Sequence, residues 1–268
     1  MALAEKYNLI IVEDCAHAHG AKWRGQGAGT IGDFGSFSMQ SSKIMTAGEG
    51  GFLICRDEEM AYRAMSLIDC GRPHDPDEKI FTMGANYRVS ELQAALLNVA
   101  IERFPAQAKQ REELAAYMDE ALSEVPGVRV LARDPRHTTR SFYRYVFAID
   151  PETFGADHDV VCAALHVEGI PCWEGYEAMH NYELFQPKLS NLAVPSAFPE
   201  RFDFEAMNLP EATRACEHEA VWFDENIFRT DQDGVDDAVT ALKKIQARLS
   251  SDQGAVAEIK RLLAEYHG

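Results

Sequence analysis

The 268-residue sequence lacks two features that define large classes of proteins. It has no excess of basic residues, because 26 Lys and Arg stand against 43 Asp and Glu, for a formal net charge of −17. Phosphates and anionic lipid headgroups are bound by basic surfaces, so this balance argues against nucleic acid and against a membrane surface as partners. No apolar run approaches the ~20 residues that span a bilayer. We therefore expect no nucleic-acid partner and no membrane association.

Paired cysteines and a targeting segment are also missing. The six cysteines are scattered without a CxxC pair, which is typical of reduced cytosolic thiols rather than of a disulfide framework. The first residues, MALAEKYNLIIVED, lack the basic front end of a signal peptide. We therefore expect a cytoplasmic location. The composition, 46% hydrophobic and 26% charged, is that of a globular enzyme or small-molecule binder.

The apolar patterns that are present predict an α/β protein. The continuous run Leu9–Val12 predicts a strand buried on both faces of a sheet and followed by Glu13 and Asp14. Residues Met1–Tyr7 predict the end of a helix, with Asn8 as its cap. A parallel strand normally follows an earlier strand and a crossover helix. The pattern therefore indicates a fold truncated at its N-terminus.

Further elements follow from helical spacing, caps and breaks along the chain. The glycine-rich stretch Gly20–Gly35 predicts a loop, and Pro105 is expected to interrupt a long helix. Pro126-Gly127 predicts a boundary between two domains, residues 1–126 and 127–268. The remaining predictions are strands over Gly35–Met39, Gly51–Cys55, Val128–Leu131 and Ser141–Ile149, and helices over Asp57–Cys70, Ser90 to Pro105, Ala106–Val125, Asp157–Glu168, Asp236–Leu249 and the tail around Val256–Leu263.

Four short patterns carry candidate chemistry: EDCAH at 13–17, FSMQSSK at 37–43, GEGG at 48–51 and GANYR at 84–88. Lys43 follows small polar residues after a strand, and Asp14 ends another strand, where open α/β sheets bind ligands. These groups suit a pyridoxal phosphate site, in which a lysine forms a Schiff base and an aspartate keeps the pyridine nitrogen protonated. Ser38 offers a hydroxyl for the phosphate, and His17 can reach the ring or its phenolic oxygen.

In this order the four patterns resemble those of the DegT/DnrJ/EryC1/StrS family, fold-type-I pyridoxal phosphate enzymes that mostly aminate keto-sugars and keto-cyclitols. The resemblance covers about residues 9–100 and is looser beyond them. It implies an aspartate aminotransferase-like α/β fold, with part of a large, mainly parallel-sheet domain in residues 1–126 and a smaller α+β domain in 127–268. It also implies transfer of an amino group from glutamine or glutamate to a ketone similar to scyllo-inosose.

The resemblance assigns roles residue by residue. Lys43 is the catalytic Schiff-base lysine, and Asp14 is the partner of the pyridine nitrogen. His17 contacts the phenolic oxygen, and Ser38 binds the phosphate. Asn86 matches an asparagine that reaches the phosphate of a neighbouring subunit, which implies a homodimer with shared sites.

Two other functions stay open. The FSMQSSK motif also resembles the corresponding motif of amino-hydroxybenzoate synthases, which indicates a pyridoxal phosphate lyase as an alternative. Alternatively, the chain is a truncated, catalytically incompetent relative that acts through interactions. Resembling enzymes have an upstream half that cradles the phosphate and stacks an aromatic side chain on the cofactor ring, and the sequence shows no counterpart of it.

Structural interpretations exist for the same residues. Asp14 is a common turn former, and Asn86 is suited to shaping a turn. Cys15, His17 and His19 alternate, so in an extended segment they would share one face as a metal triad, but no fourth ligand follows and we expect no metal site. Cys15 as a nucleophile would need an activating base, so a buried thiol is favoured.

Overall fold

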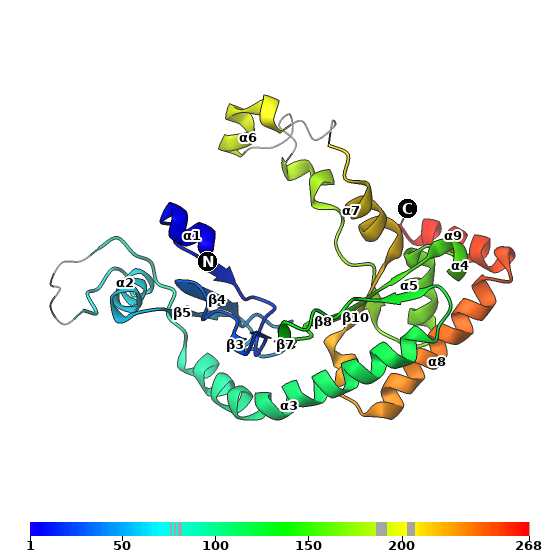
Figure 1. Ribbon diagram of the computed structural model, residues 1–268, viewed down its shortest axis with the longest axis horizontal. Coiled ribbons are helices and arrows are strands. Elements are labelled where there is room, and N and C mark those ends of the chain that lie inside the picture. The colour runs from blue at the N-terminus through cyan, green and yellow to red at the C-terminus, as the bar shows by residue number, and fades with distance from the viewer. Residues whose placement is uncertain (76, 78, 80–81, 186–191, 203–206, 268) are drawn as a thin grey trace. The chain divides into compact units, whose positions relative to one another are not determined.

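A computed structural model describes residues 1–75, 77, 79, 82–185, 192–202 and 207–267 (Figure 1). The chain forms two compact units, and each is described by itself. Unit 1 comprises Met1–Glu113 and Arg133–Tyr143, and unit 2 comprises Leu114–Ala132 and Arg144–Gly268. These units do not test the domain boundary expected after residue 126, which stays a prediction.

Unit 1 is built on a three-stranded mixed sheet in the order β1-β4-β5 (Figure 1). Strand β1 runs parallel to β4, and β5 runs antiparallel to β4. Helix α2 starts where Asp57 accepts a hydrogen bond from the Met60 backbone N–H, as its capping position predicts. The bounds are α1 Ala2–Tyr7, β1 Val12–Asp14, β4 Phe34–Ser38, β5 Gly51–Cys55 and α2 Glu58–Ile68.

The first strand is shorter and more exposed than its sequence predicts. It begins at Val12, and Leu9, Ile10 and Val12 are 55%, 68% and 62% exposed, so the expected burial on both faces is wrong. The physical reason is position, because β1 is an edge strand with β4 as its one hydrogen-bonded neighbour in the described residues. The helix before it is confirmed, since Asn8 caps α1 in the left-handed conformation.

The glycine-rich stretch contains a hairpin that the loop prediction missed. Strand β2 pairs antiparallel with β3 on one side and with β7 on the other. Its two turn residues, Arg24 and Gly25, both have positive φ, which is the backbone of a tight hairpin turn. The bounds are β2 Lys22–Trp23, β3 Gln26–Gly27 and β7 His137–Thr139.

A single helix, α3, extends from Glu91 to Ser123, so the predicted interruption at Pro105 is wrong. Proline removes one backbone hydrogen bond, to the carbonyl four residues earlier. Pro105 and Ile101 are both exposed, so water can hydrate the carbonyl of Ile101 that loses its partner. The rest of the helix keeps its own hydrogen bonds on both sides, and the chain passes through the proline.

Unit 2 contains an antiparallel sheet in the order β6-β8-β10-β9, with helices packed against it (Figure 1). Its core is aromatic and aliphatic, with Phe147 and Phe223 fully buried and in edge-to-face contact. The bounds are β6 Val128–Val130, β8 Arg144–Ile149, α4 Pro151–Phe154, α5 His158–Val167, β9 Cys172–Trp173, α6 Ala193–Ala197, α7 Pro210–Arg214, β10 Ala220–Asp224, α8 Gln232–Leu249 and α9 Gln253–His267.

Most predicted elements of unit 2 are confirmed, with shifted ends. Strand β8 begins at Arg144 rather than at Ser141, because Phe142 adopts a positive φ that a strand does not allow. Helix α8 begins four residues before Asp236, because Asp231 accepts a hydrogen bond from the Gly234 N–H and caps it there. Strands β9 and β10 had no predicted counterpart.

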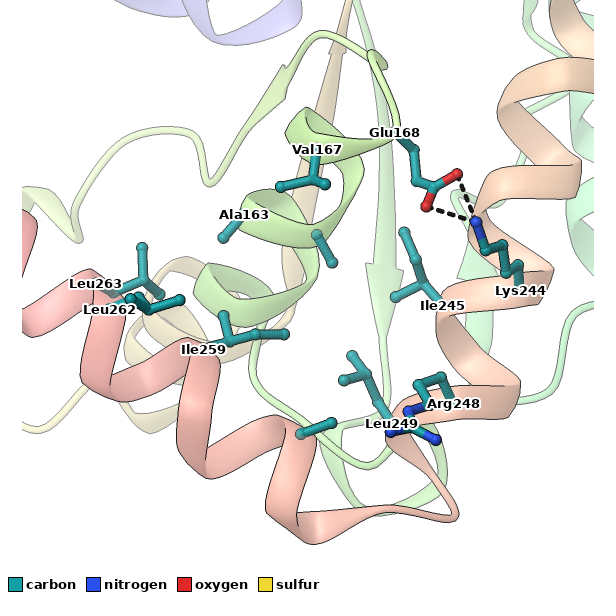
Figure 2. Close-up of a pocket in the computed structure, with 12 residues that line it drawn as sticks. Ala163, Val167, Glu168, Lys244, Ile245, Arg248, Leu249, Ile259, Leu262 and Leu263 are labelled. Atoms are coloured by element: carbon teal, nitrogen blue, oxygen red, sulfur yellow. Dashed lines mark hydrogen bonds and ion pairs between the residues drawn. The ribbon is translucent and has the colours of Figure 1, made fainter.

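An apolar groove of about 490 Å³ lies between α5, α8 and α9 in unit 2 (Figure 2). Val167, Leu249 and Ile259 are among its lining residues, and the Lys244 ammonium pairs with the Glu168 carboxylate at 2.7 Å. None of the residues predicted to carry chemistry lines this groove. No helix in the described part of the chain is long and apolar enough to cross a membrane.

Candidate active site

The parallel pairing of β1 with β4 brings the two main sequence patterns to one edge of the sheet. Asp14, the last residue of β1, pairs with Ser36 of β4, and β4 ends two residues further on at Ser38. The turn carrying His17 follows β1, and the turn carrying Lys43 follows β4. This edge, at the carboxyl ends of parallel strands, is where open α/β sheets bind ligands.

Gln40 shapes the turn that presents Lys43. Its side-chain oxygen accepts hydrogen bonds from the Ser42 N–H at 2.8 Å and from the Ser42 hydroxyl at 2.6 Å. The Gln40 carbonyl accepts from the Lys43 N–H at 3.0 Å, and the Ser38 hydroxyl oxygen accepts from the Gln40 N–H at 3.3 Å. Ser38 is therefore joined to the lysine turn through Gln40.

Tyr143 contacts both halves of this site. Its ring stacks on the His17 ring with centroids 3.9 Å apart and planes 22° apart. The half-buried Lys43 side chain places Nζ 4.5 Å from the centroid of the same ring, within the range of a cation–π contact. One aromatic side chain thus joins the turn after β1 to the turn after β4.

Glu13 and Asp14 are neighbours with different environments, because successive strand residues point to opposite faces. The Glu13 carboxylate accepts hydrogen bonds from the N–H groups of Gly29, Ile31 and Gly32, at 2.7–2.8 Å. It therefore fastens the glycine-rich stretch to β1. Asp14 is exposed, and one of its carboxylate oxygens accepts from the Ala16 N–H at 3.0 Å. Asp14 is thus a turn former whose other oxygen remains available for a ligand.

Gly29 shows why this stretch needs glycine. Its φ is +84°, and a Cβ added there would lie 2.6 Å from the ring of Phe37. Gly35 of β4 lies directly against it, since a Cβ at Gly35 would meet the backbone of Gly29 at 2.3 Å. The stretch and the strand therefore pack backbone to backbone, and Glu13 supplies the hydrogen bonds that hold them.

His19 is a buried polar residue with 2% exposure, next to the end of β4. Its Nε2 lies 2.9 Å from the Ser38 carbonyl, which only accepts, so Nε2 carries the proton. Burial lowers the pKa of His19, the positive charges of Lys43 and His17 add to this, and the bond to Ser38 opposes it. The ring is therefore held neutral, with its Nδ1 buried and without a hydrogen-bond partner among the described residues.

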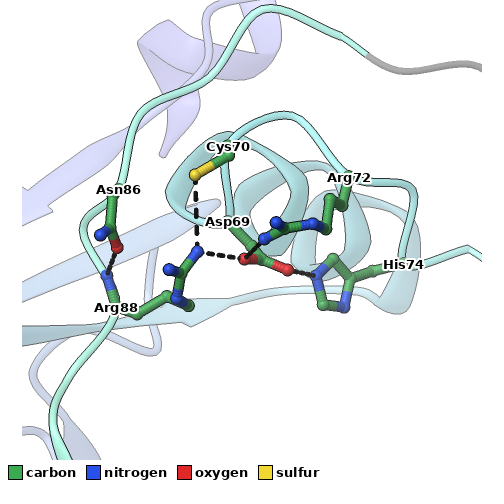
Figure 3. Close-up of polar contacts among 6 residues, drawn as sticks. All are labelled: Asp69, Cys70, Arg72, His74, Asn86 and Arg88. Atoms are coloured by element: carbon green, nitrogen blue, oxygen red, sulfur yellow. Dashed lines mark hydrogen bonds and ion pairs between the residues drawn. The ribbon is translucent and has the colours of Figure 1, made fainter.

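Asn86 lies on a separate part of unit 1, fastened to the end of α2 (Figure 3). It forms an antiparallel bridge with Asp69, and its side-chain oxygen accepts from the Arg88 N–H at 3.4 Å. Partial desolvation raises the pKa of Asp69, but hydrogen bonds from Arg88, His74 and Arg72 outweigh it and lower this pKa overall. This carboxylate therefore stays charged and pairs with the Arg88 guanidinium at 2.5 Å, and Asn86 itself lies in a bridge rather than in a turn.

The alternating Cys15, His17 and His19 do not share a face, because the chain turns at Ala16–His17 instead of staying extended. Cys15 and His19 are buried, whereas His17 is exposed. Burial, together with Glu13 and Asp14, raises the pKa of the Cys15 thiol to about 11, so it is a buried protonated thiol rather than a nucleophile. Within the described residues no group of three or more His, Cys, Asp or Glu side chains is arranged to hold a metal ion.

The fold is that of fold-type-I aminotransferases. The solved structure of 3-amino-5-hydroxybenzoic acid (AHBA) synthase matches with a TM-score of 0.73 and 25% identity, over 92% of this chain and 63% of that one. PseC of Helicobacter pylori, an aminotransferase involved in the biosynthesis of pseudoaminic acid, matches with a TM-score of 0.73 over 92% of this chain and 62% of that one. The two sequences are 22% identical, so this match shows the fold alone.

Within that fold class the chain belongs to the DegT/DnrJ/EryC1/StrS aminotransferase family, whose profile matches residues 1–221. A Micromonospora echinospora protein named for L-glutamine:3-amino-2,3-dideoxy-scyllo-inosose aminotransferase activity is 39% identical over 93% of this chain and 61% of its own length. The L-glutamine:2-deoxy-scyllo-inosose aminotransferase of the same organism is 32% identical, over 92% of this chain. The chain thus spans about 61% of the length of the curated relatives that it matches.

Three residues that the sequence patterns did not single out hold the turns after β1 and β4 in place. Tyr143 lies 100 positions after Lys43 and 126 after His17, and it belongs to none of the four short patterns. Gln40 and Glu13 lie inside the patterns. The role of Glu13 could have been predicted, because successive strand residues point to opposite faces and Glu13 therefore faces away from Asp14. The roles predicted for Asp14, His17, Ser38, Lys43 and Asn86 stay predictions.

Proposed function

We propose that this protein uses pyridoxal phosphate to transfer an amino group from glutamine or glutamate to a keto-cyclitol or keto-sugar. The observation that carries the proposal is the convergence of Lys43, Asp14 and His17 at the carboxyl ends of two parallel strands. Family membership and relatives named for amino transfer from L-glutamine to scyllo-inosose ketones support it.

The side chains at this edge fit the cofactor chemically. Lys43 offers an amine as the covalent anchor, and exposed Asp14 offers a carboxylate oxygen for a protonated ring nitrogen. His17 lies between them in the chain, and its ring stacks on the Tyr143 ring that Lys43 also contacts. Ser38 offers a hydroxyl that already accepts one hydrogen bond and can still donate its own proton to a phosphate oxygen.

When bound, pyridoxal phosphate accepts the electron pair that remains on carbon after proton removal. Lys43 moves that proton, because its amine is the one basic nitrogen placed in the turn after β4. Asp14 supplies the negative charge that keeps the ring nitrogen protonated. The lysine is thus both anchor and acid–base group, and the aspartate is the electrostatic partner of the ring.

The acceptor class is proposed from the relatives, because the chain spans about 61% of their length. Two of them are named for scyllo-inosose ketones, with L-glutamine as donor. A keto-cyclitol is therefore the first acceptor to test, ahead of keto-sugars. An AHBA synthase-like lyase is the second candidate, favoured by the structural match to that enzyme.

Asn86 leads us to propose a homodimer. It is exposed and is bridged to Asp69 at the end of α2. It is distant in sequence from the turns that carry Lys43 and His17, and its described hydrogen bonds are not to residues of those turns. In a dimer with shared sites, Asn86 would reach the phosphate bound by the neighbouring subunit. Sedimentation of wild-type and Asn86→Ala proteins, with and without pyridoxal phosphate, tests this assignment.

Replacing Lys43 by Ala tests the proposed function. We expect the purified chain with pyridoxal phosphate to show the visible absorbance of a lysine-bound cofactor, and Lys43→Ala to lose both this band and amino transfer to a keto-cyclitol. Lys22→Ala, in the hairpin strand β2, is the matched control and should keep both. A Lys43→Ala protein that retains them contradicts the assignment.

The acceptor panel separates the candidates. Amino transfer to keto-cyclitols supports the proposal, whereas aromatisation of an amino-hydroxybenzoate precursor favours the lyase. If the wild-type chain at its full 268 residues binds the cofactor but turns over no substrate, the catalytically incompetent alternative gains support.

A further inference from the structure

Tyr143 has a place in the site that none of the four short patterns indicates. It is the last residue before β8, directly after the positive-φ residue Phe142, and it belongs to unit 1 rather than to the unit that contains β8. Its ring contacts His17 by stacking and Lys43 by a cation–π contact. No other described aromatic ring contacts both residues.

The phenol of Tyr143 adds a directional hydrogen bond to this arrangement. Its oxygen lies 3.0 Å from the Ser42 hydroxyl oxygen. Ser42 has one hydroxyl proton and donates it to the side-chain oxygen of Gln40. The Tyr143 hydroxyl must therefore donate to Ser42, so the ring is tied to the same turn that carries Lys43.

A lysine side chain is among the costliest to order, because several rotatable bonds must be fixed. The Tyr143 ring offers the Lys43 ammonium a preferred place, and its hydroxyl fixes the ring on the lysine turn. His17 stacks on the same ring and so receives its orientation from the same source.

We propose that Tyr143 is a positioning residue that places the Lys43 amine and the His17 ring before a cofactor arrives. This inference deepens the proposed function and rests on it for its biological meaning. The contact between the Tyr143 ring and the Lys43 ammonium is a property of the chain without cofactor and can be tested independently of the proposed function.

The test therefore measures Lys43 in the full 268-residue chain without cofactor. Competitive labelling with acetic anhydride, followed by peptide mass spectrometry, gives the acetylation rate of Lys43 relative to Lys22 in the same molecule. An amine held against the ring face is less accessible to the reagent, so releasing it from the ring raises the rate. We expect Tyr143→Leu to raise the relative rate about three- to fivefold, and Tyr143→Phe, which keeps the ring, to change it less than twofold.

A second variant separates the cation–π contact from simple packing. Pentafluorophenylalanine at position 143 keeps the ring shape of the Tyr143→Phe variant but reverses the charge distribution of its face. We expect it to raise the Lys43 rate about threefold over Tyr143→Phe. The same replacement at Phe142, whose ring lies near Arg133 and Arg140, is the matched control and should leave Lys43 unchanged.

Circular dichroism of each variant identifies those that fail to fold, and the fluorinated variant keeps the test decisive if Tyr143→Leu is one of them. A Lys43 rate that does not respond to fluorination at 143 overturns the inference. Wild-type protein that shows no cofactor absorbance overturns the proposed function instead, and the labelling result stands apart from it.

Discussion

Unit 2 places aromatic side chains at its centre, whereas unit 1 holds its loops with side-chain hydrogen bonds to the backbone. Among the twelve largest fully buried side chains of the described residues, Met39 alone belongs to unit 1. In unit 1 a single carboxylate, that of Glu13, holds three backbone N–H groups of the glycine-rich stretch. A closely packed apolar core stabilises a unit but does not orient polar groups. Directed hydrogen bonds hold polar groups in defined positions at a sheet edge. The candidate chemistry lies in the unit that uses the second method.

Truncating one aromatic residue in each unit tests this contrast with the largest expected effect. Phe147 is fully buried in unit 2, so Phe147→Ala should lower the free energy of unfolding of that unit by about 3–5 kcal/mol. Phe52, stacked on Phe37 in unit 1, is 40% exposed, and Phe52→Ala should cost about 1 kcal/mol. Urea unfolding followed by tryptophan fluorescence measures both.

The three tryptophans let each unit be followed separately. Trp23 lies in unit 1, and Trp173 and Trp222 lie in unit 2. A Trp23→Phe background reports on unit 2, and a background with Trp173→Phe and Trp222→Phe reports on unit 1. Equal losses for the two truncations would contradict the contrast between the units.

Removing the Asp14 charge should impair chemistry without affecting stability. In Asp14→Asn the side-chain oxygen still accepts from the Ala16 N–H, so the turn is preserved and only the charge is lost. We expect amino transfer to fall about a hundredfold, the usual cost of removing one preorganised electrostatic partner. The melting temperature should stay within a degree or two of wild type. Transfer within threefold of wild type would mean that Asp14 is only a turn former.

Its neighbour should show the opposite behaviour. Glu13→Gln keeps one acceptor oxygen but turns an amide N–H₂ toward a backbone donor, so at least one buried N–H loses its partner. We expect unit 1 to lose about 2 kcal/mol of its free energy of unfolding, measured by Trp23 fluorescence. Glu59→Gln on α2, where the exposed carboxylate pairs with Arg63, is the control and should cost under about 0.5 kcal/mol.

The smallest predicted effect is a pH dependence that belongs to unit 1. Burial lowers the pKa of His19 in the folded chain, so below about pH 6.5 the unfolded chain takes up a proton that the folded chain does not. Stability is therefore complete above that pH and falls as the pH drops, by at most about 1.4 kcal/mol per pH unit. Urea unfolding at pH 7.5 and 5.5 measures the loss.

A His19→Gln variant provides the reference for this pH effect. Its amide N–H₂ can still donate to the Ser38 carbonyl, but it does not titrate. The difference in unfolding free energy between the two pH values should shrink in the variant for unit 1 and stay the same for unit 2. An unchanged difference in unit 1 would assign the pH dependence to other groups.

Most helices and several strands were predictable because their signals are local, although the interior strand β10 was missed. Asp57 begins α2 and Gly169 ends α5, as capping preferences require. Pro105 and the hairpin at Arg24–Gly25 were mispredicted because both outcomes depend on surroundings that local preference does not include. A helix tolerates a proline where water can replace the lost bond, and β2 is stabilised by β7, which lies more than 100 residues away.

By itself the sequence determined which residue types stand at the two strand ends: a lysine in a small polar turn, and an aspartate, a histidine and a serine at the spacing of the family. The tertiary structure decided which of them meet. The parallel pairing of β1 with β4 brings the turns together, and Tyr143, far along the chain, joins His17 to Lys43. Strand pairing and ring contacts are long-range interactions, and their partners are fixed by packing rather than by local preference.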